Sequence, residues 1–223
     1  MTDSIYDQLN AYGTVAKQRM VETFSGDALD TDRWQQDGLN TNGTQAMADS
    51  IDDGLLLSTG ATNGNIAFIA FNGVKQYNQT GSVMIAVIKH GQVSGGESYT
   101  GLQDGTSQGT VDGAWSYVND AWKGAYFNLN TQDNNSGSWT NFQTADGSSN
   151  TWIQTGCVTS DTNWHTHKIE LTSSQASLQI DGNTTTTVST NLPNERLQPS
   201  IGINTTANTN RTLNIRYMEC YNT

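Results

Sequence analysis

The chain has 223 residues and a formal net charge of −11, although only 14% of its residues are charged. A surface this acidic repels nucleic-acid phosphates and anionic membranes, so we expect neither nucleic acid nor membrane as a partner. No apolar run approaches the ~20 residues that a membrane-spanning helix needs.

Residues 1–20 are predicted to form an N-terminal arm, separate from one domain over 21–223. Ile5, Leu9 and Tyr12 recur at i, i+4 and i+7, so they would share one face of a short helix. An arm this short cannot bury that face by itself. We therefore expect it to pack on the domain or to dock onto a neighbouring subunit, and the sequence leaves both open.

The first half of the domain contains several predicted strands. Residues 21–24 form a short one, and 54–60 and 64–73 flank a Thr-Asn-Gly turn. Residues 81–90 are apolar in both phases of the alternation, which predicts a central strand covered on both faces. The periodicity then lapses over 91–120, which we interpret as an elaborated loop or a pair of weak strands.

The second half alternates more clearly. Residues 124–132 form a strand, and 137–158 form a hairpin. Residues 164–203 read as a run of antiparallel strands with period-2 alternation. Within that run, Asp181 and Gly182 predict a tight hairpin turn, because both residue types tolerate positive φ.

The closing strand, 211–221, contains a change of phase. Leu213 and Ile215 alternate in one phase, whereas Met218 belongs to the other. Keeping all three inward requires one extra residue in the strand. The sequence therefore predicts a β-bulge near Arg216.

Two cysteines, Cys157 and Cys220, occur in the chain. No secretory signal is evident, so an oxidising route is not indicated. We expect two reduced core cysteines in preference to one disulfide.

Three stretches resemble the concanavalin A-like lectin/glucanase jelly rolls, and the laminin-G-like branch most. They are the strands of 164–203, the opening segment Glu22 to Trp34, and the closing strand Arg211 to Tyr221. The resemblance implies an all-β fold in which two antiparallel sheets form a jelly-roll sandwich, with the arm added at the N-terminus.

The family's glycosidases carry paired acidic residues at alternating positions of one strand. Two carboxyl groups ~5 to 9.5 Å apart are what their mechanisms need. In the best-matching strand here, 124–132, the outward residues are Tyr126, Asn128 and Asn130, none of which is acidic. We therefore predict that the protein is not an enzyme. A third-ranked alternative is a glycoside hydrolase or lyase with displaced residues, for which the loop offers Glu97, Asp104 or Asp120.

Metal sites are not strongly indicated. His165 and His167 flank Thr166, which suggests a metal pair, but two surface histidines are the interpretation we favour because no third ligand lies nearby. We expect no metal or cofactor.

Relatives of this kind often hold a structural calcium with an acidic residue in the last strand. The equivalent positions here are Asn214 and Arg216, which does not support that site. Asp27, Asp30 and Asp32 could hold calcium instead, although loop aspartates more often cap turns.

Aromatic rings and carboxamides are predicted to share the outward positions of neighbouring strands. Sugars bind such surfaces, because their C–H faces stack on aromatic planes and amides pair with hydroxyl groups. The candidate glycan site comprises Tyr126, Asn128, Asn130, Trp139, Asn141, Gln143, Trp152 and Gln154. A polar outer sheet whose Trp rings fold into the core stays open as the alternative. Trp34 and Trp164 are expected to anchor the core.

The resemblance favours a non-catalytic structural or surface module of a virion, such as a phage head decoration, tail or fibre protein. Its partners would be other virion subunits, bound through the arm, and surface glycans. A cellular lectin or carbohydrate-binding module is the second hypothesis. The virion surface is the expected location, with a soluble cytoplasmic or extracellular protein as the alternative.

Overall fold

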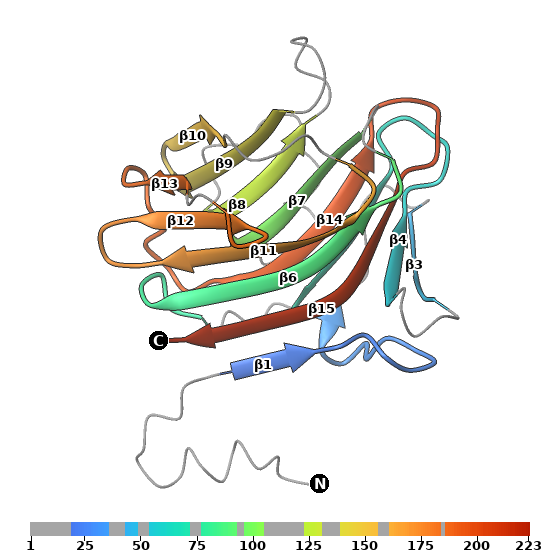
Figure 1. Ribbon diagram of the computed structural model, residues 1–223, viewed down its shortest axis with the longest axis horizontal. Helices are drawn as coiled ribbons and strands as arrows, with labels where there is room; N and C mark the ends of the chain where they lie inside the picture. The colour runs from blue at the N-terminus through green and yellow to red at the C-terminus, as the bar shows by residue number, and fades with distance from the viewer. Residues whose placement is uncertain are drawn as a thin grey trace, which may run out of the picture.

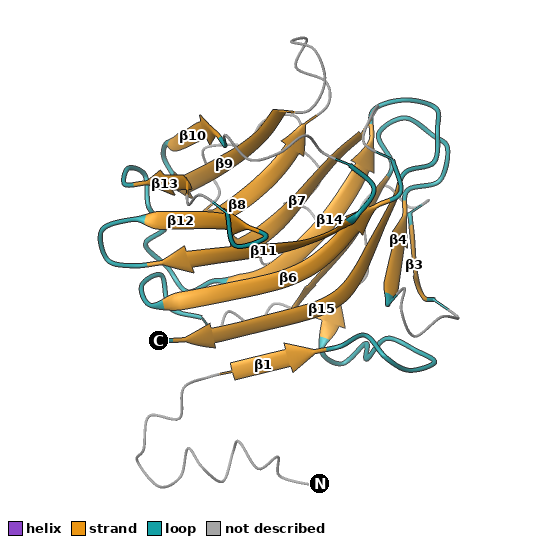
Figure 2. Ribbon diagram, viewed as in Figure 1, coloured by secondary structure: helices purple, strands orange, loops and turns teal. Residues whose placement is uncertain are grey.

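The structure is a computed structural model that describes residues 19–35, 43–48, 54–71, 77–92, 96–104, 123–130, 139–155, 161–183 and 186–223. These residues form two antiparallel sheets stacked face to face (Figures 1 and 2). No helix in the described residues is long and apolar enough to cross a membrane. Ile5, Leu9 and Tyr12 of the predicted arm lie outside the described residues.

Sheet A has the strand order β13-β12-β11-β6-β15-β4-β3, and β1 pairs with the second half of β15. Its strands are β1 (Arg19–Glu22), β3 (Thr44–Met47), β4 (Leu55–Ser58), β6 (Ser82–His90), β11 (Trp164–Leu171), β12 (Ala176–Ile180), β13 (Thr186–Val188) and β15 (Thr212–Asn222).

Sheet B has the strand order β10-β9-β8-β7-β14-β5-β2. Its strands are β2 (Trp34–Gln35), β5 (Ile66–Phe71), β7 (Gly96–Gln103), β8 (Lys123–Asn130), β9 (Trp139–Asp146), β10 (Asn150–Gln154) and β14 (Gln198–Thr205). The predicted all-β sandwich of two antiparallel sheets is thereby confirmed.

The core lies between the sheets, because alternate residues of each strand point toward the other sheet. Trp34 is one of its anchors, as predicted. It is 1% exposed, and its ring centroid lies 5.6 Å from that of Phe24 and 4.9 Å from that of Phe71. Cys220 is buried in the core as a free thiol, whereas Cys157 lies outside the described residues.

Trp164 is not a core anchor, contrary to expectation. Its register partner in β6 is Lys89, which faces away from sheet B, and Trp164 faces the same way. Lys89 Nζ lies 4.9 Å and Arg216 Cζ 4.2 Å from the ring centroid, so two cations stack on the indole. Trp164 therefore belongs to the outer face of sheet A.

The β-bulge predicted in the closing strand is confirmed. The register of β15 against β6 shifts between Ile215 and Tyr217, which leaves Arg216 as the extra residue. Gly54, with φ +62°, passes close to this point: a Cβ there would lie 2.2 Å from the Ile215 carbonyl oxygen. The bulge keeps both halves of β15 facing the core and requires glycine beside it.

The two predicted hairpins also form. Strands β9 and β10 pair from Asn150 opposite Ala145, within the expected range 137–158. Asp181 and Gly182 have φ values of 51° and 72°, as a tight primed turn requires.

The stretch 91–120, which the sequence leaves open as an elaborated loop or a pair of weak strands, contains one strand in its described part. Its residues 96–103 form β7, a central strand of sheet B that pairs with both β8 and β14. Alternation does not indicate this strand clearly, because its inward residues include the small polar Ser98 and Thr100 instead of large apolar ones. Residues 105–122 lie outside the described part of the chain.

Two histidines are buried on the inner face of sheet A. His90 lies 2.6 Å, Nε2 to Oγ, from Ser98, and His167 meets the Phe127 ring edge-on at 4.5 Å. Burial, followed by the charges of neighbouring histidines, lowers the pKa of His90 to about 4 and that of His167 to about 3. The expected surface position of His167 is wrong, because alternation along β11 turns it inward with Ile169.

We predict that the free energy of unfolding falls as the pH drops from about 6.5 to about 5. The unfolded chain gains protons on His90 and His167 near their ordinary pKa of about 6.5, whereas the folded chain excludes them until the pH nears the lowered values. His167→Phe should reduce this slope by up to about 1.4 kcal/mol per pH unit. Urea unfolding across this range measures it, and an unchanged slope would contradict a neutral buried His167.

Candidate functional site

The candidate glycan site lies on the outer face of sheet B, the face turned away from sheet A. Tyr126 stands directly opposite Gln143 across β8 and β9, and Gln143 stands opposite Trp152 across β9 and β10. One phenol, one carboxamide and one indole therefore form a row across three neighbouring strands. Trp152 is 62% exposed, which places it on the surface and not in the core.

Two glycines make room for the Tyr126 ring. A Cβ at Gly101, opposite it in β7, would lie 2.4 Å from the Cβ of Tyr126, and one at Gly124 would lie 2.8 Å from its ring. Tyr126 is 4% exposed, and burial, reinforced by the charge of Asp104, raises the pKa of its hydroxyl far above the ordinary value. The phenol is thus a fixed, neutral hydrogen-bonding group.

Carboxamides and a second phenol continue the face on either side of Tyr126. Gln143 and Gln103 are almost fully buried, and Tyr99 stands opposite Asn128. Burial raises the pKa of Tyr99 well above its ordinary value, although hydrogen bonds with Ser200 and Gln103 oppose the shift. This part of the face is neutral and rich in groups that both donate and accept.

Two buried polar atoms of β8 lack a hydrogen-bond partner. Among the side chains that the structure describes, the Tyr126 hydroxyl and Asn128 Oδ1 are buried without one. Such atoms each cost ~1 to 3 kcal/mol when they stay unsatisfied, so they commonly mark a place where a ligand or water completes the network.

Other predicted members of the site lie nearby. Asn141 is half-buried opposite Asn128, and Gln154 is exposed opposite Asn141. Asn130 and Trp139 are opposite each other at the end of the β8–β9 ladder, and their side chains lie outside the described ones. The described side chains of the predicted set therefore lie on the outer face of sheet B.

One of the acidic candidates, Glu97, lies on this face and not in a loop. Glu97, expected in a loop, is on β7, in register with Asn204 of β14 and Asn130 of β8. It is 3% exposed; Asn204 Nδ2 donates to Glu97 Oε2 at 3.3 Å, and the Glu97 amide donates to Asn204 Oδ1 at 3.2 Å. The only available signal was the alternation Glu97, Tyr99, Gly101, which lacks apolar residues.

The other two acidic candidates are Asp104 and Asp120. Asp104 directly follows β7, and its carboxylate accepts a hydrogen bond from the Lys123 amide at 3.0 Å, so it ties the end of β7 to the start of β8. Asp120 lies outside the described residues.

An aspartate caps a turn in the loop that contains Asp27, Asp30 and Asp32. The Asp32 amide donates to Asp30 Oδ1 at 3.1 Å. Within the described ranges, no group of three or more His, Cys, Asp or Glu side chains is arranged to hold a metal ion.

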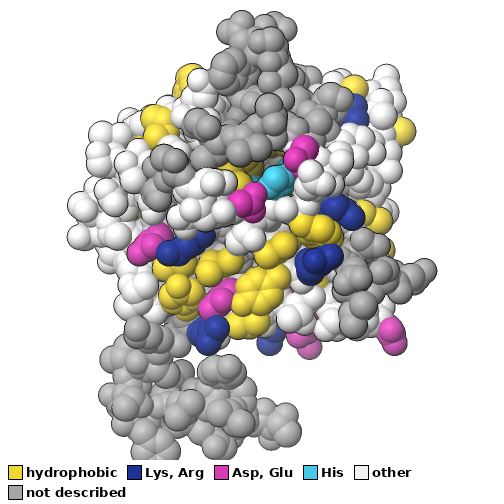
Figure 3. All heavy atoms as spheres, viewed as in Figure 1, with side chains coloured by type: hydrophobic (Ala, Val, Ile, Leu, Met, Phe, Trp, Pro, Cys, Tyr) yellow, Lys and Arg dark blue, Asp and Glu magenta, His cyan; other side chains and the backbone are white. Residues whose placement is uncertain are grey.

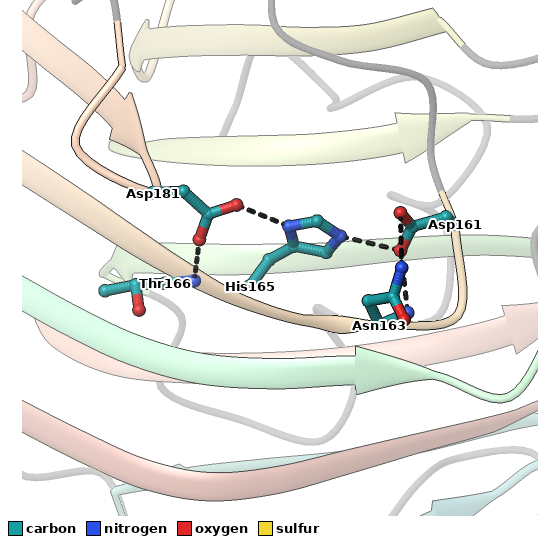
Figure 4. Close-up of polar contacts among 5 residues, drawn as sticks. All are labelled: Asp161, Asn163, His165, Thr166 and Asp181. Atoms are coloured by element: carbon teal, nitrogen blue, oxygen red, sulfur yellow. Dashed lines mark hydrogen bonds and ion pairs between the residues drawn. The ribbon is translucent and has the colours of Figure 1, made fainter.

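His165 occupies a second polar cluster, at the start of β11 in sheet A (Figure 4). Its Nδ1 lies 2.6 Å from Asp181 Oδ2 and its Nε2 lies 2.8 Å from Asp161 Oδ1. Burial of the ring opposes protonation, but hydrogen bonds to Asp181 and Asp161 outweigh it and raise the pKa of His165. Both ring nitrogens are engaged, so His165 offers no lone pair to a metal. The cluster instead joins the start of β11 to the β12 turn.

Comparison with known proteins gives a fold match without a sequence match. No protein-family model matches the chain, and no curated protein matches its sequence. Among solved structures, a Bacillus licheniformis β-glucanase is similar, with a TM-score of 0.66 and 14% identity over 92% of this chain and 98% of that one.

Two other structures show the same likeness over 92% of this chain. The catalytic domain of an endo-1,3-β-glucanase (laminarinase) from Thermotoga petrophila has a TM-score of 0.65, 12% identity and 97% of its own chain covered. A pseudo-β-1,3-glucanase of Mycobacterium tuberculosis has a TM-score of 0.60, 12% identity and 98% covered. The fold is the concanavalin A-like jelly roll.

The similarity to these solved structures contradicts the prediction that the protein is not an enzyme. Glucanases are prominent among the solved structures with this fold, although one similar protein is a pseudo-glucanase. The prediction also rested on an outer face without acids, and Glu97 now stands on that face. Glu97 was not placed on that face because the stretch 91–120 shows no convincing strand in the sequence.

We predict that Asp181→Asn lowers the pKa of His165. The substitution removes one of the two carboxylates beside the imidazole, while its amide oxygen can still accept the Thr166 amide that Asp181 Oδ1 accepts at 2.7 Å. NMR titration of the imidazole measures the pKa. Asp146→Asn, at the β9–β10 turn, serves as the control that leaves it unchanged, and an unchanged value in Asp181→Asn would contradict the assigned pairing.

Proposed function

We propose that the protein binds a neutral β-linked polysaccharide along the outer face of sheet B. The observation that carries the proposal is the row of Tyr126, Gln143 and Trp152 across three strands. Support for the substrate class comes from similar folds described as β-glucanases, one of them a laminarinase.

The chemistry of the row suits a sugar chain. The exposed indole of Trp152 offers a plane for the C–H face of a pyranose ring. The carboxamide of Gln143 can donate to one hydroxyl group and accept from another. Sugar hydroxyls would also satisfy the Tyr126 hydroxyl and Asn128 Oδ1, the two atoms of β8 that are buried without partners.

Among the described outward side chains of sheet B, Glu97 carries the carboxyl group that could transfer a proton to or from a glycosidic oxygen. We assign it that role in the proposed function, since general acid catalysis requires a carboxyl held in place and Asn204 holds this one. Glycoside hydrolysis uses two carboxyl groups, and among the described outward residues of sheet B Glu97 supplies one.

We predict that Trp152→Ala weakens binding to laminarin or to mixed-linkage β-glucan at least tenfold, about 1.4 kcal/mol. Loss of the exposed ring removes stacking area without opening the core. Affinity electrophoresis and calorimetry measure the effect. Val21→Ala, which changes an exposed residue of sheet A, is the matched control. Equal affinities of Trp152→Ala and the parent protein would exclude this face as the site.

We predict that Glu97→Gln abolishes any release of reducing ends from the same glucans while their binding persists. The amide keeps the shape and the Asn204 contacts but cannot donate a proton at neutral pH. A reducing-sugar assay on the parent protein and Glu97→Gln measures this. Release that continues unchanged in Glu97→Gln would remove Glu97 from the proposed role.

The narrower role on a virion surface, and the laminin-G-like branch, remain proposals that rest on the resemblance of 164–203 and its flanking segments. Such a role is compatible with glycan binding, because a surface module can adhere to sugars. Deletion of residues 1–18, which stops short of the core residue Met20 in β1, followed by light scattering, would show whether assembly depends on the arm.

A further inference from the structure

The outer face of sheet A carries a band of apolar side chains across four adjacent strands (Figure 3). We call it the sheet A patch, and its members are Val21, Ile85, Val87, Trp164, Tyr217 and Tyr221. Val21 is 43% exposed, and the other five are half-buried. Among the described strands, those that stack on sheet A do so on its opposite, inner face.

The rim of the patch is positively charged, in contrast to the chain as a whole. Its basic residues are Arg19, Lys89, Lys168 and Arg216. Glu170 pairs with Lys168 at the rim, whereas Glu219 lies inside the band, between Val21 and Ile85, and pairs with Arg19. Four of the ten Lys and Arg residues therefore lie here, against two of the 21 Asp and Glu residues. The patch suits an occupant that is apolar in the middle and acidic beside it.

We propose that the chain's own residues 1–18 pack across the sheet A patch. Their sequence combines an apolar stripe, Ile5, Leu9 and Tyr12, with the acidic residues Asp3 and Asp7. The chain enters sheet A directly after this segment, because β1 begins at Arg19 beside Tyr221 of the patch. Burial of the stripe against the band is the driving force, at ~25 cal/mol per Å² of apolar surface.

The lengths agree with an intramolecular contact. A helix over residues 4–12 would be ~13 Å long, and the outward positions from Val83 to Val87 span about the same distance along β6. Residues 13–18 can bridge up to ~20 Å, whereas β6 lies only two strands, or ~10 Å, from β1. A short tether gives an effective concentration in the millimolar range, which favours the same chain over a second copy.

Chymotrypsin cleavage of the full-length protein tests the proposal. The segment contains Tyr6, Leu9 and Tyr12 as cleavage sites, and packing on the patch protects them. Val87→Asp places a charge in the middle of the band and should raise the cleavage rate at least tenfold. Thr187→Asp, on the same outer face but in β13, two strands away from β11, is the matched control and should leave the rate unchanged.

Two additional variants keep the test decisive. Val21→Asp, at an exposed edge position, replaces Val87→Asp if circular dichroism shows that the latter does not fold. Ile5→Asp changes the other side of the contact without removing a cleavage site. It should accelerate cleavage as Val87→Asp does, and the double variant should be no faster than either single one.

Two results would overturn the proposal. One is equal cleavage rates in the folded parent protein, Val87→Asp and Val21→Asp. The other is protection that increases with protein concentration together with an oligomer in light scattering, which would make a second copy the occupant. The proposal is independent of glycan binding, because that site lies on sheet B.

Discussion

The ladder between β6 and β15 is the interaction on which the rest of the structure depends. Strand β15 pairs with β6 along almost its whole length, and its other edge holds β4 with the first half and β1 with the second. The bulge at Arg216 lets one continuous strand keep Ile215 and Met218 both inward. Without that extra residue, the second half would turn Met218 and Cys220 toward solvent.

The two outer faces of the sandwich have acquired opposite characters. The outer face of sheet B is mainly polar, and it carries the indole of Trp152 and the carboxyl of Glu97 among carboxamides and phenols. The outer face of sheet A is apolar with a basic rim. Because each strand alternates, these outer surfaces can differ without changing the residues that build the common core.

The proposed glycan site depends on close packing around Tyr126 on the outer face of sheet B. Tyr126 fits only because Gly101 and Gly124 leave space for it, and its buried hydroxyl gains from a partner that the described protein groups do not supply. The same fold can support many different functions. The residues of this face, and not the fold, therefore decide what this protein does.

The sequence by itself determined the features that depend on neighbours along the chain. Alternation identified most strands and placed Tyr126, Asn128 and Asn130 on one face, the Asp181-Gly182 turn was read from residue type, and the bulge near Arg216 followed from a change of phase. These are local properties of backbone geometry.

Only the tertiary structure decided which strands lie side by side and which faces are covered. Strand β7 was not recognised because Ser98 and Thr100 are polar yet inward, so Glu97 was not placed on the outer face of sheet B. His167 was expected at the surface and is buried, while Trp164 was expected in the core and lies outside. Alternation separates the two faces of a strand, but whether a given face is inner or outer depends on pairing between residues far apart in the chain.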